Sequence, residues 1–225
     1  MMKKMQLISV LIVITISAAL VAMLQPLSPR SKDHDLPIRV ACVGDSITEI
    51  TGYPSILQTL LGPNYCVGNF GASGSTVLLD SWEPYMNQSA FQKALNFQPN
   101  VVVIMLGTND DLEMLRPSNE SFEQDYAKLI RAFQQLEVKP QIWIATPPPI
   151  FSNSSDLSSA YLSSVIIPKI VDLADKMNLP LIDVYTAFGN HPDYFVDGVH
   201  PNSKGATLIA REVYEAIKMQ KYSNT

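Results

Sequence analysis

Short apolar runs alternate with amphipathic stretches throughout the chain after residue 37. The apolar runs cover residues 38–43, 65–70, 101–106, 141–146 and 179–184. Most of them are continuously apolar, which is typical of strands whose two faces are both buried in a parallel sheet. The pattern therefore predicts an α/β fold, a flavodoxin-like three-layer α/β/α sandwich around a five-stranded parallel sheet.

The stretches between these runs carry apolar residues at helical spacing. The helices that this spacing predicts cover residues 54–61, 121–136, 161–177 and the stretch that follows Asn202 or Ser203. Gly62 is a natural end for the first of them. Ser121 and Gln124 have the spacing of a capping box at the start of the second. Pro168 is expected to start or to kink the third helix.

The N-terminal end of the chain has a different character. Lys3 and Lys4 precede an uncharged apolar run at residues 7–24, and this is the order found in an export signal. As a helix, the run would measure about 27 Å, close to the thickness of the hydrocarbon core of a bilayer. We expect residues 1–24 to be a cleaved signal peptide or a retained membrane anchor, which implies an extracytoplasmic location, secreted or membrane-attached.

The remainder of the chain has the length of a single domain. Residues 25–36 form a polar, proline-bearing linker, residues 37–219 the predicted domain and residues 220–225 a tail. The composition, 47% hydrophobic and 16% charged, is that of a globular protein. The formal net charge is −5, and the lack of a basic stripe argues against nucleic acid as a partner.

Polar residues follow most of the predicted strands at their carboxyl ends, where open parallel sheets place their active sites. The corresponding loops read GDSITEITG, GASGST, GTNDD, TPPPIFSNSSD and YTAFGNHPDYFVDGVHPNSKG. The loop Gly71-Ala72-Ser73-Gly74 lacks the three-glycine spacing of a dinucleotide fingerprint, and neither this loop nor GDSITEITG carries the lysine of a P-loop. The sequence therefore argues against a phosphate-bearing cofactor.

Ser46, directly after the first strand, is a candidate nucleophile, provided that a base lies close to its hydroxyl. His200 belongs to the last loop, which the topology would bring to the same rim of the sheet. A turn at Gly198 could fold the carboxylate of Asp197 back onto the Nδ1–H of His200, leaving Nε2 free to face the serine. The alternative is structural, because Ser46 and His200 could each simply cap a helix.

An acyl-transfer site also needs hydrogen-bond donors for the developing oxyanion. The chain offers the backbone N–H of Ser46, the backbone N–H of Gly71 and the side-chain amide of Asn109. Asn109 follows a strand that is otherwise built for burial. Gly71 lacks a Cβ and would allow close approach of a substrate, although a tight turn would explain it equally well.

Four motifs, in this order, resemble the SGNH (GDSL-type) hydrolase family of esterases and acylhydrolases. They are Gly44-Asp45-Ser46-Ile47-Thr48, Asn69-Phe70-Gly71-Ala72-Ser73-Gly74, Gly107-Thr108-Asn109-Asp110 and Asp197-Gly198-Val199-His200-Pro201-Asn202. The resemblance extends from about residue 38 to residue 217. It departs in the first loop, where Glu49-Ile50-Thr51 precede Gly52 and many relatives turn sooner. The shape of the local pocket is therefore open.

The resemblance implies the SGNH hydrolase fold and a set of roles. Ser46 would be the nucleophile, His200 the base and Asp197 the residue that orients the base. Ser46, Gly71 and Asn109 would form the oxyanion hole. Neither a cofactor nor a metal is implied.

These observations predict a serine esterase that works through an acyl-enzyme. The loops are short and polar, and no long apolar insertion could form a lid or an acyl tunnel. This favours a small-molecule or glycan ester, with a short acyl group such as acetyl on a carbohydrate or another polar alcohol. The alternatives are a lysophospholipase or thioesterase type of acylhydrolase, and a non-catalytic SGNH-like domain that binds sugar or a partner.

Two further possibilities concern metal binding and disulfide formation. His191, Asp193, Asp197 and His200 lie within ten residues and could hold a metal such as zinc. That arrangement would leave Ser46 and Asn109 unexplained. The two cysteines, Cys42 and Cys66, are expected to be buried free thiols, but a disulfide is possible if their strands are neighbours in an oxidising compartment.

Overall fold

The computed structural model describes residues 36–223, except for residue 113 and residues 116–120 and 152–156. The apolar run at residues 7–24 and most of the linker lie outside the described residues, so their interpretation stays a prediction. Within the described part of the chain, no helix combines the length and the apolar character that crossing a bilayer requires. Residues from Pro37 onward form one compact unit.

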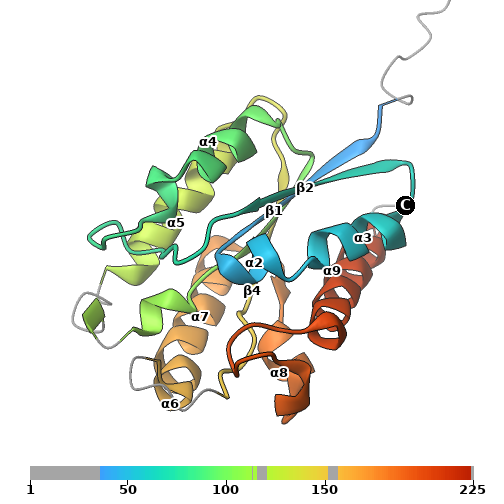
Figure 1. Ribbon diagram of the computed structural model, residues 1–225. Coiled ribbons are helices and arrows are strands. Elements are labelled where there is room, and N and C mark those ends of the chain that lie inside the picture. Colours follow the sequence, from blue (N-terminus) through green and yellow to red (C-terminus); the bar gives the residue numbers. More distant parts are fainter. Residues whose placement is uncertain (1–35, 113, 116–120, 152–156, 224–225) are drawn as a thin grey trace, which may run out of the picture. The chain divides into compact units, whose positions relative to one another are not determined.

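Within the described residues, five parallel strands form one sheet in the order β2-β1-β3-β4-β5, and Figure 1 shows β1 and β2 running side by side. The strands are β1 (Ile38–Gly44), β2 (Tyr65–Gly71), β3 (Val101–Met105), β4 (Gln141–Ala145) and β5 (Leu181–Ile182). The predicted α/β fold is therefore confirmed. β1 and β3 lie inside the sheet, and all five residues of β3 are buried, which explains why these runs are continuously apolar.

Helices cover both faces of the sheet (Figure 1). One face carries α2 (Ser46–Ile50), α3 (Tyr53–Leu61), α8 (Val184–Phe188) and α9 (Ser203–Ser223), and the other carries α4 (Ser89–Asn96), α5 (Phe122–Gln134) and α7 (Ile167–Met177). Alternate residues of β1 point into two separate cores. Val40 and Cys42 pack with α3 and α9, whereas Ala41 and Val43 pack with α4, α5 and α7.

The structure differs from the sequence-based prediction at several element ends. The fifth strand is two residues long rather than six, because Asp183 accepts a hydrogen bond from the N–H of Thr186 at 3.0 Å and so caps α8. Ser121 is the N-cap residue of α5, but its side chain makes no capping hydrogen bond. The predicted capping box is therefore not formed.

The helix predicted at residues 161–177 is interrupted. It begins with α6 (Ser159–Tyr161), passes through a π-helical stretch at Leu162–Ile166 and continues as α7. Pro168 lies in the first turn of α7, where the missing backbone N–H of a proline costs nothing. Pro168 thus marks the point where α7 follows the π-helical stretch, and it does not start the helix as a whole, which already begins at Ser159.

The two cysteines lie on neighbouring strands but in different registers. Cys42 of β1 pairs with Asn69, and Cys66 of β2 pairs with Arg39. An offset of three residues corresponds to about 10 Å along a strand, whereas a disulfide requires Cα atoms within about 7 Å. Both cysteines are free, as expected, but only Cys42 is buried, whereas Cys66 is partly exposed. Burial raises the pKa of the Cys42 thiol to about 12, and a hydrogen bond with Tyr53 opposes this only in part.

Candidate active site

Ser46 is presented by a tight change of direction between β1 and α2. The carboxylate of Asp45 accepts a hydrogen bond from the N–H of Ile47 at 2.9 Å and thereby caps α2. Gly44 has to be a glycine, because a Cβ there would lie 2.7 Å from the carbonyl oxygen of Met105. The side chain of Ser46 therefore lies just beyond the carboxyl end of β1, an inner strand of the sheet, and at the N-terminus of α2.

His200 lies in a short loop that is closed on itself just before α9. Phe195 and Pro201 form an antiparallel bridge, and the N–H of Val196 donates to the carbonyl of His200 at 2.9 Å. Asn202 then caps α9 by accepting from the N–H of Lys204 at 2.9 Å. The histidine is thus fixed between a bridge and a helix start.

Asp197 lies at the head of this loop and holds the imidazole of His200. Its Oδ2 lies 2.7 Å from Nδ1 of His200, and its Oδ1 accepts from the N–H groups of His200 at 2.7 Å and of Val199 at 2.9 Å. The bend passes through Gly198, whose φ is +84°, a value that glycine adopts readily. The turn that the spacing of Asp197 and His200 predicts is present.

The electrostatics of Asp197 favour its ionised form. Partial burial raises the pKa of the carboxyl group. The hydrogen bonds from the backbone and side chain of His200 and from the N–H of Val199 outweigh this effect, so the pKa falls to about 2. A carboxylate that stays ionised can hold Nδ1–H and stabilise the imidazolium that forms when Nε2 takes up a proton.

Ser46 and His200 meet at the carboxyl ends of the strands. The Oγ of Ser46 lies 2.9 Å from Nε2 of His200, and the two residues are 154 positions apart in the sequence. Ser46, His200 and Asp197 thus form a continuous chain of hydrogen bonds. This geometry allows the imidazole to take the serine proton while the carboxylate orients the ring.

The three expected oxyanion donors differ in their availability. Ser46 is the first residue of α2, and the N–H groups of the first turn of a helix have no intrahelical acceptor. The amide of Asn109 donates to the carbonyl of Ser75 at 3.0 Å, which leaves its second N–H. The N–H of Gly71, however, donates to Oδ1 of Asn69 at 3.0 Å. The N–H of Gly71 is thus already bonded to a residue of its own strand, β2.

Gly74 offers a backbone N–H that the sequence analysis did not single out. It lies in a turn closed by the N–H of Ser75 and the carbonyl of Ala72 at 3.2 Å, with a φ of +77°. Within the described residues, no hydrogen bond uses the N–H of Gly74. Because Asn109 bonds to the adjacent Ser75, the Gly74 turn and the Asn109 amide lie side by side. The sequence does hold a signal for this turn, because the second motif ends in a glycine, the residue that most readily adopts a positive φ.

Two buried carboxyl groups lie beneath the site. Burial raises the pKa of Asp45 to about 6, although hydrogen bonds from Ile47 and Thr108 and the charge of His200 lower it in part. Burial also raises the pKa of Asp110 to about 7, with opposing hydrogen bonds from Val77 and Leu78 and a further increase from the charge of Asp45. Asp45 fixes α2, and Asp110 fixes the chain after the Gly74 turn. Both groups therefore support the geometry around Ser46.

The possible metal ligands form two separate pairs. His191 lies 3.5 Å from Asp193, and His200 lies 2.7 Å from Asp197. Among the described residues, which include all four of these, no group of three histidine, cysteine or acidic side chains is placed to hold a metal ion. The geometry gives the metal interpretation no support.

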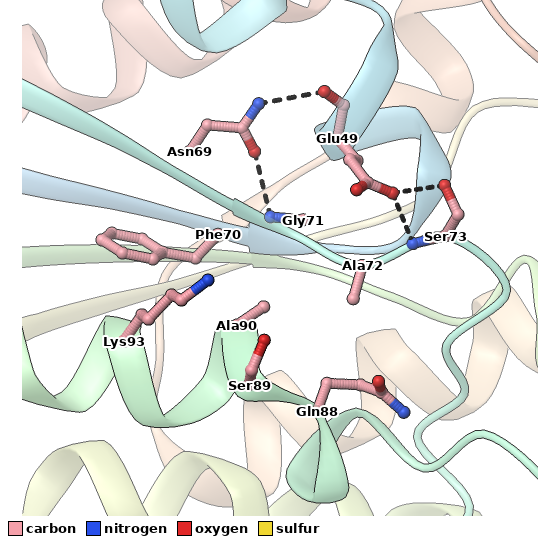
Figure 2. Close-up of a pocket in the computed structure, with 10 residues that line it drawn as sticks. All are labelled: Glu49, Asn69, Phe70, Gly71, Ala72, Ser73, Gln88, Ser89, Ala90 and Lys93. Carbon is pink, nitrogen blue, oxygen red and sulfur yellow. Dashed lines mark hydrogen bonds between the residues drawn. The ribbon is translucent and has the colours of Figure 1, made fainter.

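A polar pocket of about 440 Å³ lies at the outer edge of β2. Figure 2 shows its walls, which come from α2, from the end of β2 and from the start of α4. The lining residues are Glu49, Asn69, Phe70, Gly71, Ala72, Ser73, Gln88, Ser89, Ala90 and Lys93. Neither Ser46 nor His200 lines it, so both side chains lie outside the pocket, and its link to Ser46 is Glu49 of the same helix α2.

Comparison with solved structures shows the same fold. A carbohydrate acetylesterase family member from Sinorhizobium meliloti superposes with a TM-score of 0.66 at 21% identity, over 80% of this chain and 97% of that one. The native aryl esterase of M. smegmatis superposes with a TM-score of 0.64 at 18% identity, over 80% of this chain and 98% of that one.

Two curated proteins are similar in sequence. The acetylxylan esterase of Xylanibacter ruminicola is 37% identical over 80% of this chain and 43% of that protein. The GDSL esterase/lipase CPRD49 of Arabidopsis thaliana is 25% identical over 57% of this chain and 58% of its own length. The chain thus spans less than two thirds of the length of each of these relatives.

A family profile confirms the family resemblance that the four motifs indicate. The profile of the GDSL-like lipase/acylhydrolase family matches residues 42–208. This range contains all four motifs and the hydrogen-bonded chain of Ser46, His200 and Asp197. The protein belongs to the GDSL-like lipase/acylhydrolase family.

Proposed function

We propose that this protein is a serine esterase that removes short acyl groups, above all acetyl, from a carbohydrate or another polar alcohol. The observation that carries the proposal is the hydrogen-bonded series from Ser46 through His200 to Asp197, with distances of 2.9 Å and 2.7 Å. Such a series makes a serine hydroxyl nucleophilic at neutral pH.

The reaction would proceed in two steps. In the first, the Oγ of Ser46 attacks the ester carbonyl while Nε2 of His200 takes the serine proton. The imidazolium then gives this proton to the departing alcohol, and an acyl-enzyme remains. In the second step, His200 removes a proton from water, which attacks the acyl-enzyme. The imidazolium then returns this proton to the Oγ of Ser46 as the bond to the acyl group breaks and the acid is released. Asp197 keeps the imidazole oriented in both steps.

The oxyanion in each step needs donors that are already in position. We assign this role to the backbone N–H of Ser46, to the free N–H of the Asn109 amide and to the backbone N–H of Gly74. Gly74 replaces Gly71 here, because the N–H of Gly71 already bonds to Asn69. The hydrogen bond from Asn109 to the carbonyl of Ser75 supports this assignment, since it joins the second and third donors.

The preference for an acetyl ester of a polar alcohol has two supports. One similar protein is an acetylxylan esterase, and the pocket beside Ser46 is lined largely by polar side chains. A long acyl chain, as in a lysophospholipase or thioesterase, would require an apolar channel. The pocket at the edge of β2 does not have that character.

A series of p-nitrophenyl esters of increasing acyl length tests the substrate preference. We expect kcat/KM to be highest for the acetate and to fall steadily with longer chains. A maximum at the octanoate or a longer ester would overturn the preference for acetyl. Complete inactivity towards every ester of the series and towards acetylated xylo-oligosaccharides would favour the non-catalytic binding domain.

We also infer that the domain acts outside the cytoplasm. The support is the order of two lysines followed by the uncharged apolar run at residues 7–24. Mass spectrometry of the protein from its native membrane and secreted fractions would identify the mature N-terminus. An intact N-terminus in the cytosolic fraction would contradict this inference.

A further inference from the structure

The pocket at the outer edge of β2 is lined by residues that take no part in the proposed reaction. β2 is the edge strand of the sheet, so within the described part of the chain no further strand covers residues 69–73 on that side. α2 lies on one side of this edge and α4 on the other, as Figure 2 shows. The space between them, about 440 Å³, falls within the range of small-molecule sites, about 300–1,000 Å³.

Two opposite charges face each other across this pocket without pairing. Figure 2 shows the amine of Lys93 and the hydroxyl of Ser89 directed inward from α4, opposite the carboxylate of Glu49 on α2. Among the described residues, Lys93 takes part in no ion pair. Glu49 uses one carboxylate oxygen to accept from both the N–H and the hydroxyl of Ser73, which leaves the other oxygen available.

This pair of charges selects a particular class of ligand. An anion would be attracted by Lys93 and repelled by Glu49, and a cation would meet the reverse situation. A neutral ligand with several hydroxyl groups satisfies both, because each hydroxyl can accept from an ammonium group and donate to a carboxylate. The hydroxyl of Ser89 adds a group that can do either.

The pocket also has an apolar wall that suits a sugar ring. Phe70 lines it and is held by packing against Phe97, with ring centroids 5.2 Å apart. Ala72 and Ala90 complete this wall. The C–H face of a pyranose is apolar while its rim carries hydroxyl groups, so one face can contact Phe70 while the rim reaches Lys93 and Glu49.

The pocket is close enough to Ser46 to receive part of the same substrate. Glu49 follows Ser46 by three residues in α2, and side chains at this spacing lie on one helix face with about 5–6 Å between their Cβ atoms. A group bound beside Glu49 would therefore lie within one sugar unit of the ester that Ser46 attacks.

We propose that the pocket between α2, β2 and α4 is a subsite for a neutral sugar unit of the acetylated substrate, bound by Lys93, Glu49 and Ser89 against Phe70. This inference rests on the proposed esterase function and goes beyond it. It assigns the recognition of the alcohol part of the ester to residues that do not take part in the chemical steps. Glu49 belongs to the part of the first loop that departs from many relatives, so the subsite is a local feature of this chain.

The test compares a substrate that reaches the pocket with one that does not. The value of kcat/KM is measured for acetylated xylotetraose and for p-nitrophenyl acetate, and their ratio is taken for each variant. The pocket variants are Lys93→Met, which keeps the aliphatic stem and removes the charge, and Ser89→Ala. The matched control is Lys139→Met, an exposed lysine in the loop before β4, at the opposite end of the strands.

We expect Lys93→Met to lower this ratio by about 3- to 10-fold and Ser89→Ala by about 2- to 5-fold, the effect of losing one hydrogen bond to a bound ligand. Lys139→Met should leave the ratio unchanged. Xylotetraose without acetyl groups should inhibit p-nitrophenyl acetate hydrolysis by the wild type, and about 3- to 10-fold more weakly in Lys93→Met.

The possible failures can be told apart. If the wild type hydrolyses both substrates but the ratio is the same in Lys93→Met and Lys139→Met, the subsite is refuted and the esterase proposal stands. Hydrolysis of p-nitrophenyl acetate without hydrolysis of acetylated xylotetraose or glucose pentaacetate would also refute the subsite. If the wild type hydrolyses none of these esters, the proposed function fails, and the subsite fails with it.

Discussion

The Oγ of Ser46 lies 2.9 Å from Nε2 of His200, although 154 residues separate them in the chain. The two residues come from opposite ends of the domain, one from the end of β1 and the other from the loop before α9. Their approach follows from the parallel sheet, because all the strands end at the same rim. This geometry, and the packing and buried groups that support it, have consequences that can be measured in solution.

The first concerns the residue that orients the base. Asp197→Asn should lower kcat by at least about 10-fold and up to about 10⁴-fold, because an amide can favour the wrong tautomer of His200. Steady-state kinetics with p-nitrophenyl acetate would show the change in kcat. A variant with the wild-type rate would mean that the base needs no carboxylate partner.

Asp197 also predicts an effect of acid on stability. Its folded-state pKa of about 2 lies below the ordinary value of about 3.9. The ionised carboxylate therefore stabilises the fold above about pH 4, and this contribution is lost as the pH falls towards 2. Asp197→Asn should show a smaller loss of unfolding free energy than the wild type over this acid range. Since the side chain is 53% exposed, the difference should be small.

The second prediction concerns the oxyanion hole. Asn109→Ala removes one side-chain donor and should lower kcat by about 10²- to 10³-fold with little change in KM. Labelling by a fluorophosphonate, which also passes through an oxyanion, should be slower in the same variant. Turnover by Asn109→Ala at the wild-type rate would remove Asn109 from the site.

The third prediction concerns the packing of Gly71 against the backbone of α2. An alanine Cβ at position 71 would lie 2.3 Å from the backbone nitrogen of Glu49, so α2 would have to move. Gly71→Ala should therefore lower the free energy of unfolding by about 2–3 kcal/mol, the upper part of the range for overpacking, because the clash is with backbone. The control is Gly52→Ala, where a Cβ meets nothing within 4 Å and the positive φ accounts for a cost of about 1 kcal/mol. Equal losses in urea denaturation would contradict the close packing.

The fourth prediction concerns the buried carboxyl group of Asp45. Its pKa in the folded protein is about 6, above the value of about 3.9 in the unfolded chain. The folded state therefore binds more protons between these values, and stability falls as the pH rises from about 4 to about 6. The fall should be on the order of 1–3 kcal/mol.

Asp45→Asn keeps an oxygen that can accept from the N–H of Ile47 and removes the titrating group. Its free energy of unfolding, measured by urea denaturation from about pH 4 to 6, should vary less than that of the wild type. Asp110, with a pKa of about 7, titrates in the same direction and remains in the variant. An identical pH dependence in the two proteins would show that Asp45 ionises normally in the fold.

Much of this arrangement could be predicted from the sequence. Continuous apolar runs predicted buried parallel strands, and the spacing of Asp197, Gly198 and His200 predicted the turn that holds the imidazole. These features depend on local chemistry, on turn residues and on a topological rule that brings the ends of the strands together. The same rule places Ser46 and His200 at one rim, whereas the sequence left open whether each only caps a helix, and the distance of 2.9 Å decides this.

Other features depend on tertiary contacts that no local pattern reveals. α4 and α8 are short, and α8 exists because Asp183 ends β5 and caps the helix at once. The N–H of Gly71 is engaged by Asn69, whereas the N–H of Gly74, at a positive φ, has no acceptor among the residues that the structure describes. A sequence shows two glycines in one motif but not which amide is free. The pocket likewise arises from the edge position of β2.

The most direct measurement is covalent labelling of the nucleophile. A fluorophosphonate should label the wild-type protein on one serine, and mass spectrometry of the digested protein should identify Ser46. Ser46→Ala should neither be labelled nor hydrolyse p-nitrophenyl acetate. His200→Ala should fold, as judged by circular dichroism, and be labelled very slowly. Labelling of another serine, or hydrolysis by Ser46→Ala at the wild-type rate, would contradict the assignment of Ser46 as the nucleophile.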